Sequence, residues 1–367
     1  MKILFVSDLY NIDNNNDSKA LNNFVSEWQR SGHEVFVIRP NFLFNTLLRG
    51  KKISKEKLFE ENGVKVLNLN FLTPFWGNIW KKIPYDFSDF DVLISHMPSG
   101  ALFSLRLKEK LNIKHCNSVH ISDIEVLTNP LYSIYFKNKL LSVYKQADYI
   151  SPRSFCLKNK IEKNIGENKN IFIAPSGVKK EYIIERKNIE EPQKLIITTV
   201  ANLIKRKNID VVLKALSKIK EFDFEYRIIG DGKERKKLQK LAEKLKINDK
   251  VKFIGKLPHE IVLENLRQSH VFVMISQNET FGLAYLEAMA SGNIVICAKD
   301  EGIDGILKNS ENGFLCDINS DSLKDLLIEV YNLKFDEISK ILENTRNTAF
   351  ENTEEIASQN YFKNLFN

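Results

Sequence analysis

Hydrophobic positions along the chain fall into short, almost wholly apolar runs that alternate with longer mixed segments. In the first half, such runs occupy 3–6, 34–38, 64–69, 92–95, 114–120 and 149–150, and a helix-like segment at 18–31 ends before Gly32. Runs this short and this uniformly apolar are typical of parallel strands buried on both faces. The pattern therefore predicts a parallel sheet in the first half.

The same alternation restarts in the second half. Strands are expected at 195–200, 225–230, 251–254, 271–276, 294–298 and 313–315, and helices at 208–220, 233–245, 260–268, 282–290 and 320–331. This rhythm in both halves predicts two doubly wound α/β domains, since 367 residues are too many for one ordinary core. We expect an N-terminal domain at 1–174, a linker at 175–192, a second domain at 193–345, and a C-terminal helix at 346–367 that returns to the first domain.

Composition narrows the class of protein. A hydrophobic content of 43% and a charged content of 28% are typical of a soluble globular protein. The apolar run in MKILFVSDLY is too short for a secretory signal and is expected to be the first strand, and no segment approaches the roughly 20 apolar residues of a membrane-spanning helix. The four cysteines are scattered without a CxxC pair, so we expect a reducing cytoplasm and no disulfide or metal site.

The net charge does not identify the kind of partner. The formal net charge is +7, and residues 41–160 contain 18 Lys and Arg against 10 Asp and Glu. A basic excess attracts phosphates, nucleic acid or anionic lipid, and does not choose among them. A solvated surface with no partner is an equally good interpretation.

Polar loops follow four of the expected strands, at 7–16, 120–123, 201–208 and 276–283. In doubly wound folds, ligands bind at the carboxyl ends of the strands. The fourth loop leads into a helix that begins near Gly282, with Thr280 placed to cap it. The first N–H groups of a helix favour a phosphate, and a glycine lets the ligand approach the backbone.

Two carboxylates flank this helix start. Glu279 lies in the loop before the helix, and Glu287 lies inside it, four residues after Leu283. A carboxylate accepts hydrogen bonds from two neighbouring hydroxyls at once. The spacing therefore favours a ligand with a central diphosphate and a sugar at each end. The alternative is structural, with one glutamate placed by the helix dipole and the other on the surface.

The segment S276-x-x-E-T-F-G-x4-E-A-M-A-x-G resembles the E-x7-E signature of retaining glycosyltransferase family 4. The likeness covers nearly the whole chain, because MKILFVSD, SGHEVFVI, PSGV (175–178), IIGDGKERKKL (228–238), VKFIGKLP (251–258) and NGFLC (312–316) occur in the order that the family shows. The resemblance implies the GT-B fold, in which two Rossmann-like domains face each other across a cleft. GDG alone is a weak signal, since it is also an ordinary tight turn.

The resemblance implies a role for each matching residue of the second domain. Glu279 would contact the transferred sugar near the reacting carbon, Glu287 would hold the ribose, and the backbone at 281–283 (Phe281, Gly282 and Leu283) would contact the diphosphate. Lys207 would neutralise the leaving diphosphate, where negative charge builds up as the glycosidic bond breaks. A solvated basic turn at 205–207 is the structural alternative.

This chain departs from the family at two places. The family has an arginine where this chain has Asn202, so Arg206 or Lys205 would have to supply that charge. The first loop reads Asp8-Leu9-Tyr10 followed by asparagines, where many relatives have a Gly-Gly pair. Contacts of the first domain with donor or acceptor are therefore expected to be built differently.

His120 follows an expected strand and resembles the active-site histidine of the family's N-terminal domain, which lies beside the donor sugar. Asp123 is expected to orient it or to bind sugar. With Lys207 and the helix N-termini, His120 would replace a metal ion, so neither metal nor cofactor is expected. The implied reaction is transfer from a nucleotide diphosphate sugar to an acceptor hydroxyl with retained anomeric configuration, without a covalent enzyme intermediate and with domain closure to exclude water.

The expected acceptor is a glycan or glycolipid, as in the synthesis of bacterial polysaccharide, lipopolysaccharide or lipid-linked oligosaccharide. Two segments of the first domain, 42–59 and 71–84, mix apolar with basic residues, and the second contains Phe75, Trp76, Trp80, Lys81 and Lys82. Such segments suit a peripheral contact with anionic membrane. We therefore expect a cytoplasmic protein on the inner face of the membrane; ordinary loop and core packing is the alternative.

Two other functions fit the same architecture. A GT-B-fold nucleotide-sugar epimerase would turn over its donor without an acceptor, and a non-catalytic relative would bind carbohydrate only, although Glu279 and Lys207 are both present. A nicotinamide dehydrogenase is disfavoured, because no GxGxxG follows the first strand. Nucleic acid binding would depend on charge alone, so no nucleic acid partner is expected.

Overall fold

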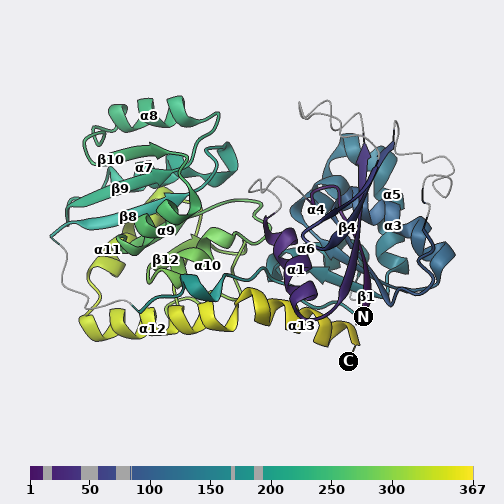
Figure 1. Cartoon of the computed structure of the whole chain (residues 1–367). Coiled ribbons are helices and arrows are strands. Elements are labelled where there is room, and N and C mark those ends of the chain that lie inside the picture. The colour runs from purple at the N-terminus through teal and green to yellow at the C-terminus, as the bar shows by residue number, and fades with distance from the viewer. Residues whose placement is uncertain are drawn as a thin grey trace. The chain divides into compact units, whose positions relative to one another are not determined.

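The computed structural model describes residues 1–10, 19–42, 57–71, 83, 85–166, 170–185 and 193–366. Contacts between residues divide the chain into two units. The first comprises Met1–Arg153, Leu157–Pro175 and Ala357–Asn367, and the second comprises Ser154–Cys156 and Ser176–Ile356 (Figure 1). The end of the chain thus belongs to the first unit from Ala357 onward, whereas we expected the returning segment to begin at residue 346.

The first unit is built on a sheet with the strand order β3-β4-β2-β1-β5-β6-β7. The strands are β1 (Lys2–Val6), β2 (Glu34–Phe42), β3 (Lys57–Glu61), β4 (Val64–Phe71), β5 (Val92–His96), β6 (Lys114–Val119) and β7 (Tyr149–Pro152). The helices are α1 (Lys19–Arg30), α3 (Met97–Leu111), α4 (Ile121–Thr128), α5 (Pro130–Gln146), α6 (Phe155–Ile165) and α13 (Glu354–Phe366). The first two residues of α6 and the first three of α13 belong to the second unit. Every strand pair except β3–β4 is parallel, as the apolar runs predicted.

Strand β3 is the one element of this sheet that the apolar pattern missed. It pairs antiparallel with β4 through a two-residue turn, in which Asn62 and Gly63 have φ angles of 49° and 75°. Asn-Gly is the preferred sequence for such a turn, so the signal was present in the sequence. Phe59, from the segment we assigned to membrane contact, lies in this strand and packs against the core. Most of 42–59, and all five named residues of 71–84, lie outside the described residues.

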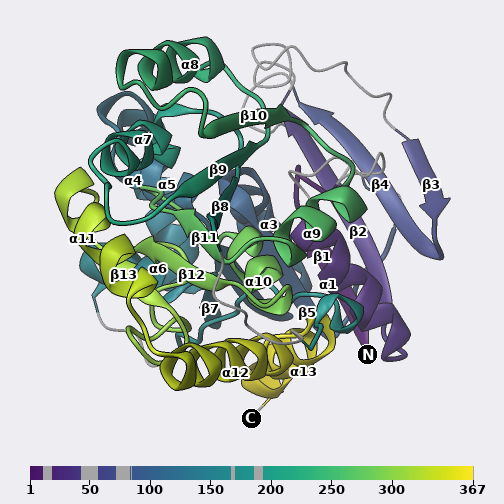
Figure 2. The same ribbon diagram turned by 90° about the vertical axis from the view of Figure 1, so that its left-hand side faces the viewer.

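The second unit is built on a wholly parallel sheet with the order β10-β9-β8-β11-β12-β13 (Figure 2). The strands are β8 (Leu195–Val200), β9 (Phe224–Ile229), β10 (Val251–Gly255), β11 (Val271–Met274), β12 (Ile294–Ala298) and β13 (Phe314–Cys316). The helices are α7 (Ile209–Leu216), α8 (Arg235–Lys244), α9 (His259–Arg267), α10 (Leu283–Ala290), α11 (Ser320–Tyr331) and α12 (Phe335–Glu351), with short 3-10 turns η2 (Lys180–Tyr182) and η3 (Lys205–Lys207). Alternate residues of β8, β11 and β12 enter the apolar clusters on the two faces of this sheet, which explains their uniform hydrophobicity.

The single helix expected at 346–367 is interrupted, because α12 ends at Glu351 and α13 begins at Glu354. At the break, the N–H of Val178 donates to the carbonyl of Asn352 at 2.9 Å, and the N–H of Glu354 donates to the carbonyl of Val178 at 3.0 Å. The backbone of Val178 thus pairs with the carbonyl of Asn352 and with the N–H of Glu354. The helix is interrupted here because these two groups bond to Val178 and not within a continuous helix. Beyond the break, Tyr361 of α13 packs on Trp28 of α1, with ring centroids 5.5 Å apart.

Candidate functional site

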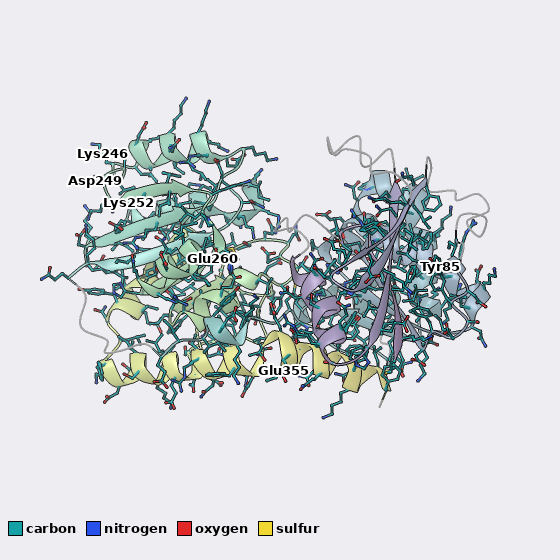
Figure 3. All side chains as sticks on the ribbon, in the orientation of Figure 1. Tyr85, Lys246, Asp249, Lys252, Glu260 and Glu355 are labelled. Atoms are coloured by element: carbon teal, nitrogen blue, oxygen red, sulfur yellow. The ribbon has the colours of Figure 1, made fainter. Side chains whose placement is uncertain are left out.

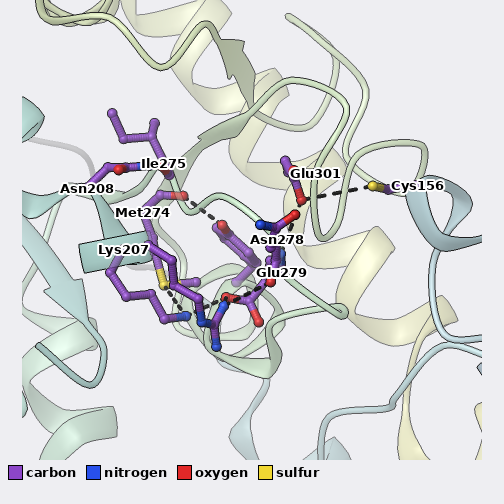
Figure 4. Close-up of polar contacts among 10 residues, drawn as sticks. Cys156, Lys207, Asn208, Met274, Ile275, Asn278, Glu279 and Glu301 are labelled. Atoms are coloured by element: carbon purple, nitrogen blue, oxygen red, sulfur yellow. Dashed lines mark hydrogen bonds and ion pairs between the residues drawn. The ribbon is translucent and has the colours of Figure 1, made fainter. Parts of the chain in front are cut away.

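Two loops at the carboxyl edge of the second sheet carry most of the residues that the sequence singled out. One follows β8 and contains η3, and the other follows β11 and leads into α10. Strands β8 and β11 are parallel neighbours, so both loops leave the same edge. The N–H of Gln277 donates to the carbonyl of Arg206 at 2.7 Å. The side-chain amide of Asn208 donates to the carbonyl of Ile275 at 2.8 Å (Figure 4). These bonds hold the two loops together.

The two loops bring Lys207, Arg206 and Glu279 into one ion cluster, in which Lys207 and Glu279 are buried. The ammonium of Lys207 contacts Oε2 of Glu279, and Nη1 of Arg206 lies 3.3 Å from the same oxygen (Figure 4). The side chains of Lys207 and Glu279 are 10% and 9% exposed, whereas that of Arg206 is 38% exposed. Arg206 thus places a second cation beside Glu279, and its role as a substitute for the charge of the family's arginine stays a prediction.

Burial and charge act differently on the two buried members of this cluster. Burial alone would raise the pKa of Glu279, but Lys207 and Arg206 together hold that pKa below its ordinary value. Burial lowers the pKa of Lys207, the attraction of Glu279 offsets only part of that effect, and repulsion by Arg206 lowers the pKa slightly further. Glu279 is thus firmly ionised, while Lys207 would be stabilised further by another anion beside it.

Helix α10 begins at Leu283, directly after this cluster. Its N-cap residue is Gly282, with a φ of 86°, two positions after the Thr280 that the sequence had suggested as the cap. A Cβ at Gly282 would lie 2.5 Å from the ring of Tyr285, so only glycine allows this turn. Gly282 offers no side chain of its own to the first backbone N–H groups of the helix, which lie next to Phe281, whose side chain is buried.

Glu287 lies in the second turn of α10 and contacts a residue that sequence reasoning missed. Its Oε1 is 2.8 Å from Nε2 of His259, the first residue of α9. The side chains of Glu287 and His259 are 13% and 25% exposed. The signal for His259 was a histidine at the expected start of a helix, next to Pro258 and shortly after the strand β10.

The GDG turn supports the loop after β8. A Cβ at Gly230 would lie 1.9 Å from the carbonyl oxygen of Ala201, and the N–H of Leu203 donates to the carbonyl of Asp231 at 2.9 Å. A residue larger than glycine at 230 would push this loop away. Asn202 is exposed in the same loop and is not among the residues shown to contact Glu279.

Glu301, in the loop after β12, is a second residue that the sequence did not single out. Its Oε2 accepts the backbone N–H of Glu279 at 3.1 Å and lies 3.9 Å from Sγ of Cys156 (Figure 4). It thereby fixes the backbone that carries Glu279. Its signal was its place just beyond a buried strand, the criterion that had selected the other loops.

In the first unit, His120 and Asp123 lie together at the carboxyl end of β6. The N–H of His120 donates to Oδ2 of Asp123 at 2.9 Å, and the hydroxyl of Tyr144 donates to Oδ1 at 2.8 Å. Nε2 of His120 is 2.9 Å from Nδ1 of His96, the last residue of β5, which was missed although it directly follows the apolar run at 92–95. His96 therefore fixes the orientation of the His120 ring.

Burial determines the charge of this histidine pair. It lowers the pKa of His120 to about 3, with a further contribution from Arg153, and it lowers the pKa of His96 well below its usual value. Burial also raises the pKa of Asp123 to about 7, against the hydrogen bonds from His120 and Tyr144. His120 is therefore neutral near pH 7, and it offers a hydrogen bond rather than a positive charge.

The first loop is described as far as Tyr10. Tyr10 is buried and packs on Phe5, with ring centroids 6.2 Å apart, and the N–H of Leu9 donates to Oγ of Ser7 at 3.2 Å. The asparagines of 11–16 lie outside the described residues. A loop that folds its aromatic residue into the core differs from the Gly-Gly loop of many relatives.

Two features are missing from the part of the chain that the structure describes. In these ranges, no group of three or more His, Cys, Asp or Glu side chains is arranged to hold a metal ion. No helix in them has the length and apolar character needed to cross a membrane.

The chain is similar to known glycosyltransferases. Residues 180–349 match the family model described as glycosyl transferases group 1. The chain is 30% identical over 354 residues to the N-acetyl-alpha-D-glucosaminyl L-malate synthase of Bacillus anthracis, covering 89% of this chain and 88% of the relative. It is 25% identical over 270 residues to the putative colanic acid biosynthesis glycosyltransferase WcaL of Escherichia coli, covering 70% and 65%.

The fold is also shared with solved structures. The crystal structure of HepE from Anabaena in complex with UDP matches with a TM-score of 0.74 at 17% identity, covering 100% of this chain and 99% of that one. The GT-B fold that the sequence implied, with two α/β domains built on parallel sheets, is confirmed.

Proposed function

The chain belongs to the group 1 glycosyltransferases, and we propose that it transfers a sugar from a nucleoside-diphosphate sugar to a hydroxyl of a glycan or glycolipid, with retention of configuration and without a metal ion. The observation that carries this proposal is the ion cluster of Lys207, Arg206 and Glu279, two members of which are buried, next to the glycine N-cap at the start of α10. A nucleotide sugar joins a diphosphate to a hydroxyl-rich ring. It therefore needs both cations and backbone N–H groups for the diphosphate and carboxylates for the hydroxyls.

The cationic part of the cluster is assigned to the diphosphate. An anion beside Lys207 would reverse the unfavourable effect of burial on its ammonium, and Arg206 is exposed enough to reach a ligand. The first N–H groups of α10, at 283 and beyond, add donors and the positive end of the helix dipole. These groups stabilise the charge that develops on the leaving diphosphate, which is the task a metal ion performs in other enzymes.

The carboxylates are assigned to the sugars. Glu279 stays ionised, since two cations lower its pKa, and an ionised carboxylate accepts hydrogen bonds from the hydroxyls of the transferred sugar. Glu287, in the second turn of α10, is assigned to the ribose. His120 is assigned to the transferred sugar as a neutral hydrogen-bonding group, with Asp123 and His96 fixing its position.

The proposed reaction needs no covalent enzyme intermediate. The bond between the anomeric carbon and the diphosphate oxygen breaks, and the acceptor oxygen bonds to that carbon from the same face. The departing diphosphate takes the acceptor proton, so the products are the glycoside and the nucleoside diphosphate. The enzyme contributes binding, orientation and charge stabilisation.

The acceptor is the least constrained part of the proposal. The relative named for colanic acid biosynthesis supports a saccharide acceptor, whereas the name of the Bacillus relative states an N-acetylglucosaminyl malate product. The comparison structure in complex with UDP supports UDP as the nucleotide to try first. A peripheral membrane contact is kept as part of the proposal, and binding to anionic vesicles in a flotation assay tests it.

A transfer assay tests this function against its alternatives. The protein is incubated with UDP-, GDP- and ADP-sugars, with and without a glycolipid extract or L-malate, and the nucleotide and saccharide products are followed by NMR. Acceptor-dependent release of nucleoside diphosphate and an α-linked product from an α-linked donor support the proposal. An epimerised nucleotide sugar without acceptor would identify an epimerase, and binding without turnover would identify a non-catalytic relative.

A further inference from the structure

We propose that His259 positions Glu287 for the ribose hydroxyls of the donor and thereby makes the site select ribonucleotides over 2′-deoxyribonucleotides. The inference rests on the proposed function, because it names a specificity-determining residue for the same donor. His259 is here a positioning residue, which acts through Glu287.

The contact between the two side chains is direct and largely shielded. Nε2 of His259 lies 2.8 Å from Oε1 of Glu287, and neither side chain is more than 25% exposed. An ionised carboxylate only accepts hydrogen bonds, so Nε2 of the imidazole carries the proton and donates it. Hydrogen bonds that involve an ionised partner are shorter and stronger than neutral ones. The bond therefore fixes the plane of the Glu287 carboxylate.

Three separate elements hold the histidine in place. His259 is the first residue of α9, after Pro258, whose φ of −54° is fixed by its ring. Its ring packs on Tyr182 of η2, with ring centroids 5.2 Å apart and planes at 49°. Ile184 lies two residues after Tyr182, and its N–H donates to the carbonyl of Ala290 at the end of α10. This bond connects the segment that carries Tyr182 to the helix that carries Glu287.

This arrangement has a consequence for affinity. A glutamate side chain that is free to rotate loses conformational entropy when it binds a hydroxyl, and a side chain already held in the bound orientation loses less. A site built to accept a hydrogen bond from a hydroxyl also discriminates against the analogue that lacks it. The ribose selectivity of Glu287 should therefore depend on His259, which does not itself need to contact the ribose.

The test measures selectivity rather than activity. Dissociation constants of UDP, GDP and ADP and of their 2′-deoxy forms are measured by calorimetry, using the base that the wild type binds most tightly. The wild type should bind the ribonucleotide at least about 10-fold more tightly, as expected for a hydrogen bond to a charged group. His259→Phe keeps a ring against Tyr182 but removes the N–H, and the selectivity should fall below about 3-fold.

Two further variants separate positioning from a structural role. His259→Gln supplies an amide N–H and should keep most of the selectivity. Glu260→Gln changes the exposed neighbour of His259 on α9 and should behave as the wild type (Figure 3). Far-UV circular dichroism and thermal unfolding of each variant confirm that the protein is folded, and His259→Ala replaces the Phe variant if the latter is not.

The outcomes distinguish this inference from the proposed function. Unchanged selectivity in His259→Phe, together with lost selectivity in Glu287→Ala, would overturn the role of His259 and leave the ribose role of Glu287 standing. A wild type that binds no nucleoside diphosphate, or that does not distinguish ribose from deoxyribose, would overturn the ribose assignment and the role of His259 with it.

Discussion

The ammonium group of Lys207 and the carboxylate of Glu279 form an ion pair in which each side chain is about nine-tenths buried. The two residues come from loops after different strands, and they are brought together because β8 and β11 are neighbours. A buried pair of this kind is costly to break, since the remaining partner is left as an uncompensated charge. The pair therefore links stability and the proposed chemistry.

Glu279→Gln is expected to lower turnover at least about 100-fold, which is the usual size of the loss when a group that stabilises a transition state is removed. The protein should fold but be less stable by roughly 3 kcal/mol, because Lys207 keeps its charge without its partner. Steady-state kinetics and urea unfolding measure the two effects, with Glu260→Gln as the matched surface control. Near-wild-type turnover would remove Glu279 from the reacting centre.

A double variant separates those two effects. Lys207→Met combined with Glu279→Gln removes both charges, so most of the lost stability should return while turnover stays low. A double variant as unstable as the sum of the single variants would show that the pair does not contribute as a unit.

Glu287→Ala is expected to weaken donor binding about 10- to 100-fold, the usual effect of losing a hydrogen bond to a charged group. The turnover number at saturating donor should change much less, because this contact is present before and during the reaction. A KM and a turnover number measured over a range of donor concentrations give both quantities. An unchanged donor affinity would contradict the ribose role.

The pH dependence should show an alkaline limit set by Lys207. Burial lowers the pKa of this ammonium from 10.5, so its proton is lost at a lower pH than for an exposed lysine. Affinity for the nucleoside diphosphate should therefore fall on the alkaline side at a pH below 10.5. In Lys207→Arg the guanidinium stays charged, and the fall should disappear. The same alkaline fall in that variant would exclude Lys207 as its cause.

Stability should decrease in mild acid because of buried histidines in the first unit. Burial lowers the pKa of His115 and of His120 to about 3, and that of His96 well below its usual 6.5. The unfolded chain takes up these protons below about pH 6.5, so this stability is complete above that pH and is lost as the pH falls toward 3. Urea unfolding at pH 7.5, 6 and 5 should show the decrease, and a flat profile would contradict it.

Asp123 opposes this trend and provides a control. Burial raises its pKa to about 7, so the folded state holds a proton that the unfolded chain loses above its own pKa, near 3.8. This residue alone would make the protein less stable as the pH rises from about 4 to 7. Removing it in Asp123→Asn should therefore make the acid loss steeper than in the wild type.

Metal removal should leave the reaction intact, because Lys207, Arg206 and the start of α10 are assigned the charge stabilisation. Initial rates are measured with and without EDTA after dialysis, and they should agree within about twofold. An activity that disappears and returns only with added metal would overturn this assignment.

Elements with a simple hydrophobic signature were predicted closely from the sequence. The bounds 195–200, 294–298 and 320–331 agree with β8, β12 and α11, because the runs are apolar on both faces or start at a capping Asn319. Strand β3 was missed because it lies at the edge of the sheet and reads KLFEE, with few apolar residues. The break between α12 and α13 involves hydrogen bonds to the backbone of Val178, which is far away in the sequence. Hydrophobic periodicity could therefore not predict where α12 ends.

The candidate site shows the same division. Spacing around the start of a helix singled out Glu279 and Glu287, and the family resemblance singled out Lys207, which lies in a loop that follows a strand. Their partners His259 and Glu301 are separated from them by 22 to 28 positions, and only the packing of helices and loops brings them together. Sequence patterns report which residues stand at a sheet edge, whereas the pairs that fix their orientation are a property of the folded chain.

The most direct test of the central claim is whether the cluster around Lys207 binds a diphosphate. Calorimetry compares UDP with UMP for the wild type and for Lys207→Met, with GDP and ADP examined in the same way. We predict that the wild type binds one nucleoside diphosphate at least about 10-fold more tightly than its monophosphate, as expected for contacts to a charged group, and that Lys207→Met loses this preference. The account is contradicted if no nucleoside diphosphate binds the wild type, or if Lys207→Met retains the full preference.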